Sequence, residues 1–316
     1  MRLLSFVQIQ QASSSGLERL AAPHIAMLEF RQVLATALSV ASVAVALCPS
    51  QIEGRFVMPW ICADASPCGN NKAVLQTQIQ QLSSVVNGTQ VFTDAAFENY
   101  GIASGNIIRQ PTALDVAGDI SKQGVHTWAM VFSTSIAEMR RCWSDTAGFI
   151  KSFTTAVVQG PGGKHVQGLN LDWEPDSMTS EDGKNFAKFL DQVSTALHSL
   201  GMKVSVAGIR GGALWDYTLI GKTAVDYVMD MNTYMDGQNG NPPPSDFSYF
   251  KEQVKACLSD LRPEQYVVCI EDNLSLAQLQ ERISFMQHQG VRKVALWLSH
   301  LAEPLPTQYF PYFANL

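Results

Sequence analysis

The chain has 316 residues, of which 46% are hydrophobic and 16% are charged, and its formal net charge is -6. This length and apolar content suffice for one large core or two small ones. The acidic balance and the lack of a basic cluster in the sequence argue against a nucleic-acid partner.

The N-terminal part of the chain has the character of a targeting segment. Residues 33–48 read VLATALSVASVAVALC, and Arg31 precedes them. Such an apolar run is short for a membrane span and typical of a secretory signal. We expect residues 1–50 to comprise an N-terminal extension and a signal peptide, with Met27 as the true start. The protein would then be secreted, or sent to a lysosome-like compartment, with no stable membrane association after cleavage. A retained N-terminal anchor is the alternative.

Export would permit disulfides. Cys62 and Cys68 bracket a short loop, and Cys257 and Cys269 bracket a helix-to-strand turn, so both pairs could close local loops. Cys142 would remain free or buried. The cysteine spacing is not that of a zinc site.

Two tripeptides, at Asn87 (NGT) and Asn273 (NLS), match the acceptor pattern for N-glycosylation. They are compatible with a secreted glycoprotein.

From residue 55 onward, short apolar runs alternate with longer segments of helical period. The predicted strands are 55–61, 89–95, 126–133, 166–174, 203–209, 225–234, 265–271 and 291–299. The predicted helices include 72–88, 147–158, 183–201, 247–261 and 275–290, and Ser180 is the expected start of the helix after the fourth strand.

Eight strands alternating with helices predict an α/β protein, a (β/α)8 TIM barrel, in one domain that covers residues 51–316. An open doubly wound sheet is the alternative, but neither the phosphate-loop nor the dinucleotide-binding glycine pattern is present.

The fourth predicted strand reads GLNLDWEP and alternates apolar with polar residues. Its polar side chains are Asn170, Asp172 and Glu174. Successive side chains of a strand point to opposite faces, so these three share one face. In a barrel that face is the interior, and Glu174 would lie at the carboxyl-terminal rim, where active sites form. Two carboxyl groups so close together favour retention of a proton by one of them, which suits a general acid.

At these residues the sequence resembles glycoside hydrolase family 18, the chitinase family. The family signature on this strand is DGxDxDxE, and residues 167–174 read QGLNLDWE. The motif is most similar to the GxNxDxE of the chitobiase and spore-germination branches. The resemblance implies that Glu174 protonates the glycosidic oxygen. Asp172 would orient the substrate's acetamido group, whose carbonyl attacks the anomeric carbon, so no metal or cofactor is implied. Gln167 and Asn170 replace the first two acids, and the predicted role of Asn170 is that its amide can still donate a hydrogen bond to Asp172.

A second similarity lies on the sixth predicted strand, where DMNTYM resembles the family pattern QxMxYD. Alternation places Asp230, Asn232 and Tyr234 inward. Tyr234 matches the tyrosine that binds the acetamido carbonyl, although it could simply be an amphipathic barrel residue. The other signature positions differ, and Asp236 is a further candidate for this pocket.

The third similarity is Trp297 in VALWLS, where the family has a tryptophan on which the sugar rests. Its alternative is a core residue. The predicted substrate-binding set is therefore Trp297, Asn170, Asp230, Asn232 and Asp236.

Weaker candidates follow the first, second and fifth strands. Trp60, Asp64 and Glu98 could line the site or belong to the surface and core, and Arg210 could bind substrate or pair with an acid.

Fewer than twenty residues separate the last two strands, so the chain has no room there for the insertion domain of many chitinases. The resemblance implies a monomeric retaining glycoside hydrolase that cleaves β-linked N-acetylglucosamine glycans, such as chitin oligomers. A non-catalytic, lectin-like protein that binds oligosaccharide or polysaccharide is the first alternative. An enzyme of another class on a similar barrel, such as an amidase, is the second.

Overall fold

The computed structural model describes residues 54–63, 71–110, 115–234, 246–299 and 303–316. The predicted signal segment and the candidates Asp64 and Asp236 lie outside these residues, so the predictions about them stay predictions. Within the described part of the chain, no helix combines the length and apolarity needed to cross a membrane.

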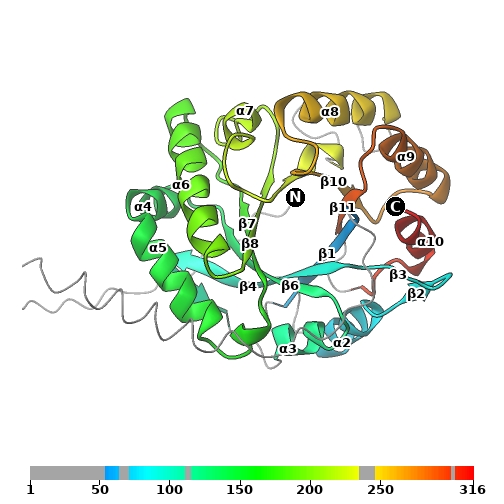
Figure 1. Ribbon diagram of the computed structural model, residues 1–316, viewed down its shortest axis with the longest axis horizontal. Helices are drawn as coiled ribbons and strands as arrows, with labels where there is room; N and C mark the ends of the chain where they lie inside the picture. Colours follow the sequence, from blue (N-terminus) through cyan, green and yellow to red (C-terminus); the bar gives the residue numbers. More distant parts are fainter. Residues whose placement is uncertain (1–53, 64–70, 111–114, 235–245, 300–302) are drawn as a thin grey trace, which may run out of the picture. The chain divides into compact units, whose positions relative to one another are not determined.

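Eight parallel strands form a closed barrel, with the helices on its outside (Figure 1). In barrel order the strands are β1 (Phe56–Cys62), β4 (Asp94–Ala103), β6 (His126–Ser133), β7 (Gly168–Trp173), β8 (Lys203–Gly208), β9 (Tyr227–Asp230), β10 (Tyr266–Glu271) and β11 (Lys293–Trp297). β1 pairs in parallel with both β11 and β4, which closes the ring. The predicted (β/α)8 barrel is confirmed, and α9 alone links β10 to β11, with no inserted domain.

The helices are α2 (Lys72–Gln81), α3 (Val116–Ser121), α4 (Ile136–Ser144), α5 (Thr146–Phe153), α6 (Ser180–His198), α7 (Tyr217–Ile220), α8 (Phe247–Asp260), α9 (Leu276–His288) and α10 (Phe310–Ala314). Each presents apolar residues to the barrel, and together they cover its outer face (Figure 1).

Strand alternation divides the apolar residues into two groups. One group fills the barrel interior and includes Met58, Trp60, Met130, Met229 and Cys269. The other packs between strands and helices. Both faces of every barrel strand are therefore covered, as a parallel barrel requires.

Strand β7 follows the predicted orientation. The ring of Trp173 stacks on Phe189 of α6 at 5.2 Å between centroids and meets Phe149 of α5 edge-to-face at 6.0 Å. Its apolar side thus faces the helices, which leaves Asn170 and Asp172 for the interior.

Two boundaries differ from the sequence prediction. The helix expected over 72–88 ends at Gln81, and a hairpin of β2 (Val85–Val86) and β3 (Thr89–Gln90) follows. Asn87 and Gly88 both have positive φ, 49° and 80°, as the tight turn between paired strands requires.

The second strand of the barrel begins at Asp94, close to the end of the predicted segment 89–95. It is β4, which extends to Ala103 and pairs antiparallel with β5 (Asn106–Arg109). Glu98 is therefore a strand residue rather than a loop residue.

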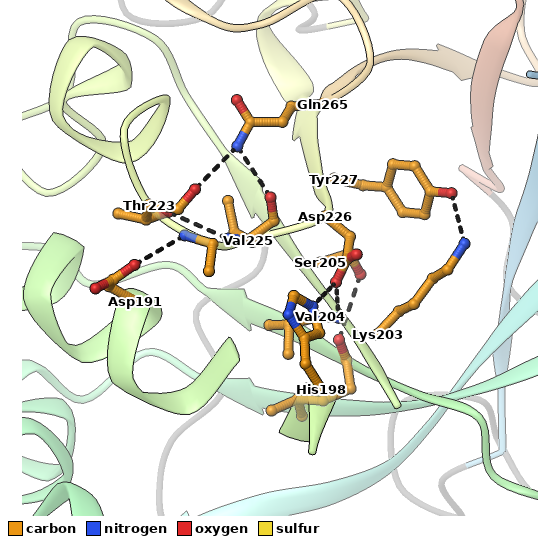
Figure 2. Close-up of polar contacts among 12 residues, drawn as sticks. Asp191, His198, Lys203, Val204, Ser205, Thr223, Val225, Asp226, Tyr227 and Gln265 are labelled. Carbon is orange, nitrogen blue, oxygen red and sulfur yellow. Dashed lines mark hydrogen bonds and ion pairs between the residues drawn. The ribbon is translucent and has the colours of Figure 1, made fainter. Parts of the chain in front are cut away.

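Polar contacts join neighbouring elements at the amino-terminal end of β8 and β9 (Figure 2). Asp226 Oδ2 accepts a hydrogen bond from the backbone N–H of Val204 at 2.8 Å. The same oxygen lies 2.8 Å from Nε2 of His198 at the end of α6. Gln265 Nε2 donates to the carbonyl oxygen of Val225 at 2.9 Å. These contacts fix this end of the barrel.

The predicted pairing of Cys257 with Cys269 is wrong, because both thiols are free and buried, as is that of Cys142. Cys269 faces the barrel interior, whereas Cys257 lies on α8 among the residues outside it, so the wall of the barrel separates them. Cys68 lies outside the described residues, and its pairing with Cys62 stays a prediction.

Candidate active site

Strand β7 brings two acids to the carboxyl-terminal end of the barrel. Asp172 lies between Phe132 of β6 and Ala207 of β8 in the sheet register and is 5% exposed. Glu174 follows the strand and is exposed, and its backbone N–H donates to the carbonyl oxygen of Ser133 at 2.9 Å. That hydrogen bond continues the strand pairing, so the two carboxyl groups project from one face with Glu174 outermost.

Asp172 and Glu174 share a side-chain hydrogen bond, and the pKa of each is raised from its ordinary value. Burial is the main cause for both, because desolvation disfavours the charged carboxylate. The nearby charge of Glu174 raises the pKa of Asp172 further. Glu174 is exposed as a residue, yet neighbouring protein desolvates its carboxyl group enough to raise its pKa. The pair therefore holds one proton in common at pH values where an isolated carboxyl group has lost it.

One oxygen of the buried acid, Asp172 Oδ1, has no hydrogen-bond partner among the described residues. A buried carboxylate oxygen without a donor is costly in a folded protein. The oxygen is thus available to accept a hydrogen bond from a ligand N–H or O–H group.

Two further acids, Glu98 and Glu271, lie on barrel strands toward their carboxyl-terminal ends. Glu98 on β4 is aligned with Cys62 and Met130, and its Oε2 lies 3.6 Å from Cys62 Sγ. Its charge adds to the raised pKa of Asp172. Glu271, which ends β10, is aligned with Trp297 of β11. From the sequence, Glu98 was only a weak candidate because the predicted second strand stopped before it. The alternation of Ala96 and Glu98 on one face of β4 is the signal that locates it.

Tyr234 lies close to the acid pair, as the resemblance implied. It packs partly buried against the interior group, and burial raises its pKa, with further contributions from Cys269, Asp172 and Glu174. Its neutral hydroxyl can donate to or accept from a ligand.

Asn170 does not donate a hydrogen bond to Asp172, so the predicted hydrogen bond between them is wrong. Its Oδ1 accepts from Trp60 Nε1 at 3.0 Å, and its Nδ2 donates to Ser205 Oγ at 2.9 Å and approaches Met229 Sδ at 3.6 Å. The residue is fully buried, with no exposed surface. It lies beneath the site and is not placed to touch a substrate.

Trp297 is partly buried at the end of β11, and its ring meets that of Trp60 edge-to-face, 5.8 Å between centroids at 71°. Trp60 itself is only 3% exposed. Trp297 therefore presents its ring at the carboxyl-terminal end of the barrel, and Trp60 supports it from within.

Two sixth-strand predictions are wrong. The Asp230 carboxylate points away from the interior: its Oδ2 accepts from Cys257 Sγ at 3.2 Å and its Oδ1 from the hydroxyl of Tyr217 at 3.4 Å. Asn232 Nδ2 donates to the carbonyl oxygen of Arg210 at 3.0 Å. Met229 faces the barrel interior, so alternation along β9 turns its neighbour Asp230 outward. The strand ends at Asp230, and the 3-10 turn Met231–Thr233 then breaks the alternation before Asn232 is reached.

Arg210 forms an ion pair with Asp260 of α8, with Nε 2.7 Å from Oδ2. Of the two roles considered for Arg210, the structure therefore favours pairing with an acid. Among the described residues, no group of three or more His, Cys, Asp and Glu is arranged to hold a metal ion.

No family model matches the sequence. A search of curated proteins found no relative either.

Solved structures match the fold with probability 1.00 at low sequence identity. The Bacillus cereus spore cortex-lytic enzyme SleL is 15% identical with a TM-score of 0.67, over 83% of this chain and 74% of that chain. A class V chitinase from Pseudomonas fluorescens Pf-5 is 14% identical with a TM-score of 0.63, over 82% and 98%. The GH18 chitinase ChiB of Flavobacterium johnsoniae is 12% identical with a TM-score of 0.58, over 83% and 93%. The chain thus has the barrel fold of the GH18 chitinases and of SleL.

Proposed function

We propose that this protein is a retaining glycoside hydrolase that cleaves β-linked N-acetylglucosamine glycans with assistance from the substrate. The observation that carries the proposal is the pair formed by buried Asp172 and exposed Glu174. Both belong to one strand end at the carboxyl-terminal rim of a closed barrel, they share a hydrogen bond, and both pKa values are raised. The chitinase-like fold of the similar structures supports this choice of substrate class.

The first step needs a proton at the outer position of the pair. Glu174, the more exposed group, would donate it to the glycosidic oxygen as the bond from the anomeric carbon to that oxygen breaks. The carbonyl oxygen of the sugar's own acetamido group would bond to the anomeric carbon in the same step.

Asp172 would stabilise this step from beneath. Its unpartnered Oδ1 is available to accept a hydrogen bond from the acetamido N–H, and its negative charge would offset the positive charge of the cyclised intermediate. Tyr234 would hold the acetamido group from the β9 side. Water would then attack the anomeric carbon while Glu174 takes a proton from it, with net retention of configuration.

The test is turnover of a fluorogenic chitobioside by the wild type and by Glu174→Gln. We expect hydrolysis by the wild type, a loss of at least about a hundredfold in kcat for the variant, and binding of N-acetylated oligosaccharides by both. Thr127→Val, which alters a buried hydroxyl elsewhere in the barrel, is the matched control and should retain full activity.

The outcomes separate the alternatives. Oligosaccharide binding by a folded wild type without release of product would replace this proposal with a lectin-like protein. Hydrolysis that a thiazoline analogue of the cyclised intermediate fails to inhibit would point instead to a mechanism without acetamido assistance.

Export as a monomer through the 1–50 segment is part of the same proposal and rests on the sequence. Amino-terminal sequencing and light scattering of the protein purified from culture medium would test it.

A further inference from the structure

A buried polar network connects the centre of the barrel to the aromatic ring at its mouth. Asn170 lies at its centre, fully buried, and accepts from Trp60 Nε1 at 3.0 Å. On its other side Asn170 donates to Ser205 Oγ at 2.9 Å, which holds the amide in one orientation. The indole of Trp60 in turn meets the ring of Trp297 edge-to-face.

Each contact in this series requires a particular orientation of the side chains that form it. The Trp60 indole has a single N–H donor, and its side chain is only 3% exposed, so bulk solvent does not reach it to replace a lost acceptor. Rotation of the Trp60 ring would leave that donor unpaired, at a cost comparable to a lost hydrogen bond. An edge-to-face contact also depends on the angle between the rings, so the orientation of Trp60 restricts that of Trp297.

We propose that Asn170 is a positioning residue, which fixes Trp60 and through it the orientation of the Trp297 ring that receives the sugar. This inference rests on the proposed function. The family has an acid at the position of Asn170. We infer that the residue at this position contributes to sugar binding and does not share a proton with Asp172. Asn170 acts at a distance, because its own side chain is closed off from any ligand.

A spectroscopic test reports on ring geometry without requiring activity. Two indoles at 5.8 Å and 71° should give an exciton couplet in the far-ultraviolet circular dichroism spectrum. We expect Trp297→Phe and Trp60→Phe to abolish the couplet and thereby assign it. Asn170→Leu should weaken or remove the couplet although both tryptophans remain, and Asn170→Asp, which keeps an oxygen acceptor for Trp60, should restore it at mildly acidic pH. Thr127→Val should leave the couplet unchanged.

A kinetic test uses the same variants. We expect Asn170→Leu to raise KM for a chitooligosaccharide on the order of three- to tenfold while kcat changes less than about twofold. Asn170→Asp should recover most of the wild-type KM. In a Trp297→Ala background, Asn170→Leu should raise KM no further, because the ring that it positions is absent.

The results distinguish this inference from the proposed function. If the wild type neither hydrolyses nor binds the oligosaccharide, the proposed function fails, and the couplet still tests the positioning of Trp297. A couplet that survives Asn170→Leu overturns the inference. So does an additive rise of KM in the double variant, or an effect of Asn170→Leu on kcat alone.

Discussion

The most informative single residue outside β7 is Glu98, whose negative charge helps to raise the pKa of Asp172. A raised pKa means that the acid pair keeps its shared proton to a higher pH than an isolated carboxyl group would. The falling limb of kcat/KM at higher pH reports the loss of that proton from the free enzyme.

We expect Glu98→Gln to move this limb to lower pH, because removal of a neighbouring negative charge makes the proton easier to lose. The measurement is kcat/KM across the pH range for the wild type, Glu98→Gln and Glu281→Gln. The Glu281→Gln variant is the control, because it removes the charge of an exposed acid on α9. An unchanged limb in Glu98→Gln would show that Glu98 does not act on the pair.

Asp230 illustrates a buried acid with a structural role. It has no exposed surface, and burial raises its pKa to about 6, against 3.8 for the ordinary aspartate. The folded state therefore binds this proton more tightly than the unfolded state. Its contribution to stability is fully present below about pH 4 and is lost as the pH rises through about 6.

We expect Asp230→Asn to reduce that pH dependence, because an amide keeps an acceptor for Tyr217 and carries no charge to desolvate. Between about pH 4 and pH 7, the wild type should lose up to about 3 kcal/mol of unfolding free energy through this group. Urea denaturation of both proteins at the two pH values measures the difference. Parallel losses in the two proteins would contradict the assignment.

Among the elements, helix α6 shows how side chains stabilise the first turn of a helix. The helix begins at Ser180, as predicted, and its N-cap is Thr179, whose side chain accepts from the backbone N–H of Asp182. The Asp182 carboxylate accepts in return from the backbone N–H of Thr179 and forms a two-point contact with Arg140, each bond 2.8 Å long. Arg140 is first among the causes that lower the pKa of Asp182.

We expect Thr179→Ala to reduce the unfolding free energy by about 1 kcal/mol, as loss of an N-cap does. Ser180→Ala, one residue along, should change it far less. Chemical denaturation of the two variants measures the difference, and equal effects would contradict the assignment of Thr179 as the N-cap.

The order and type of the elements could be predicted from the sequence because strand alternation and helical period extend over many residues. The fourth strand is the clearest example: its apolar side packs on Phe149 and Phe189, and its polar side faces inward, as alternation requires. The ends of elements were less predictable. Asn87 and Gly88 form a hairpin turn within an expected helix, and β9 stops at Asp230, where tertiary contacts to α8 replace strand geometry.

The site was predictable only where a side chain's role follows from its own strand. Asp172 and Glu174 meet that condition. The partners of Asn170 do not, since Trp60, Ser205 and Met229 come from three other strands and only the closed barrel brings them together.

At the scale of the whole molecule, the two ends of the barrel differ in their polar groups. The carboxyl-terminal end holds the acid pair with raised pKa values, and the amino-terminal end holds well-paired groups such as Asp226 (Figure 2). Barrels of this class place chemistry at the first end and stability at the second.

We therefore expect Asp226→Ala to reduce the unfolding free energy by about 1–3 kcal/mol, because it leaves the N–H of Val204 and the ring of His198 without their acceptor. The kcat on a chitooligosaccharide should stay unchanged at temperatures where the variant is folded. A changed kcat in the folded variant would mean that the two ends are coupled.

The buried thiols of Cys142, Cys257 and Cys269 can be used to detect local opening of the folded protein. Burial raises the pKa of Cys142 to about 12 and raises those of Cys257 and Cys269 as well. Only a thiolate is readily alkylated, so iodoacetamide should spare these sites while the chain is closed. Mass spectrometry would measure the rate of alkylation at each cysteine. The rate at Cys269 would report local opening of the barrel interior, and the rates at Cys142 and Cys257 would report local opening between the helices and the barrel.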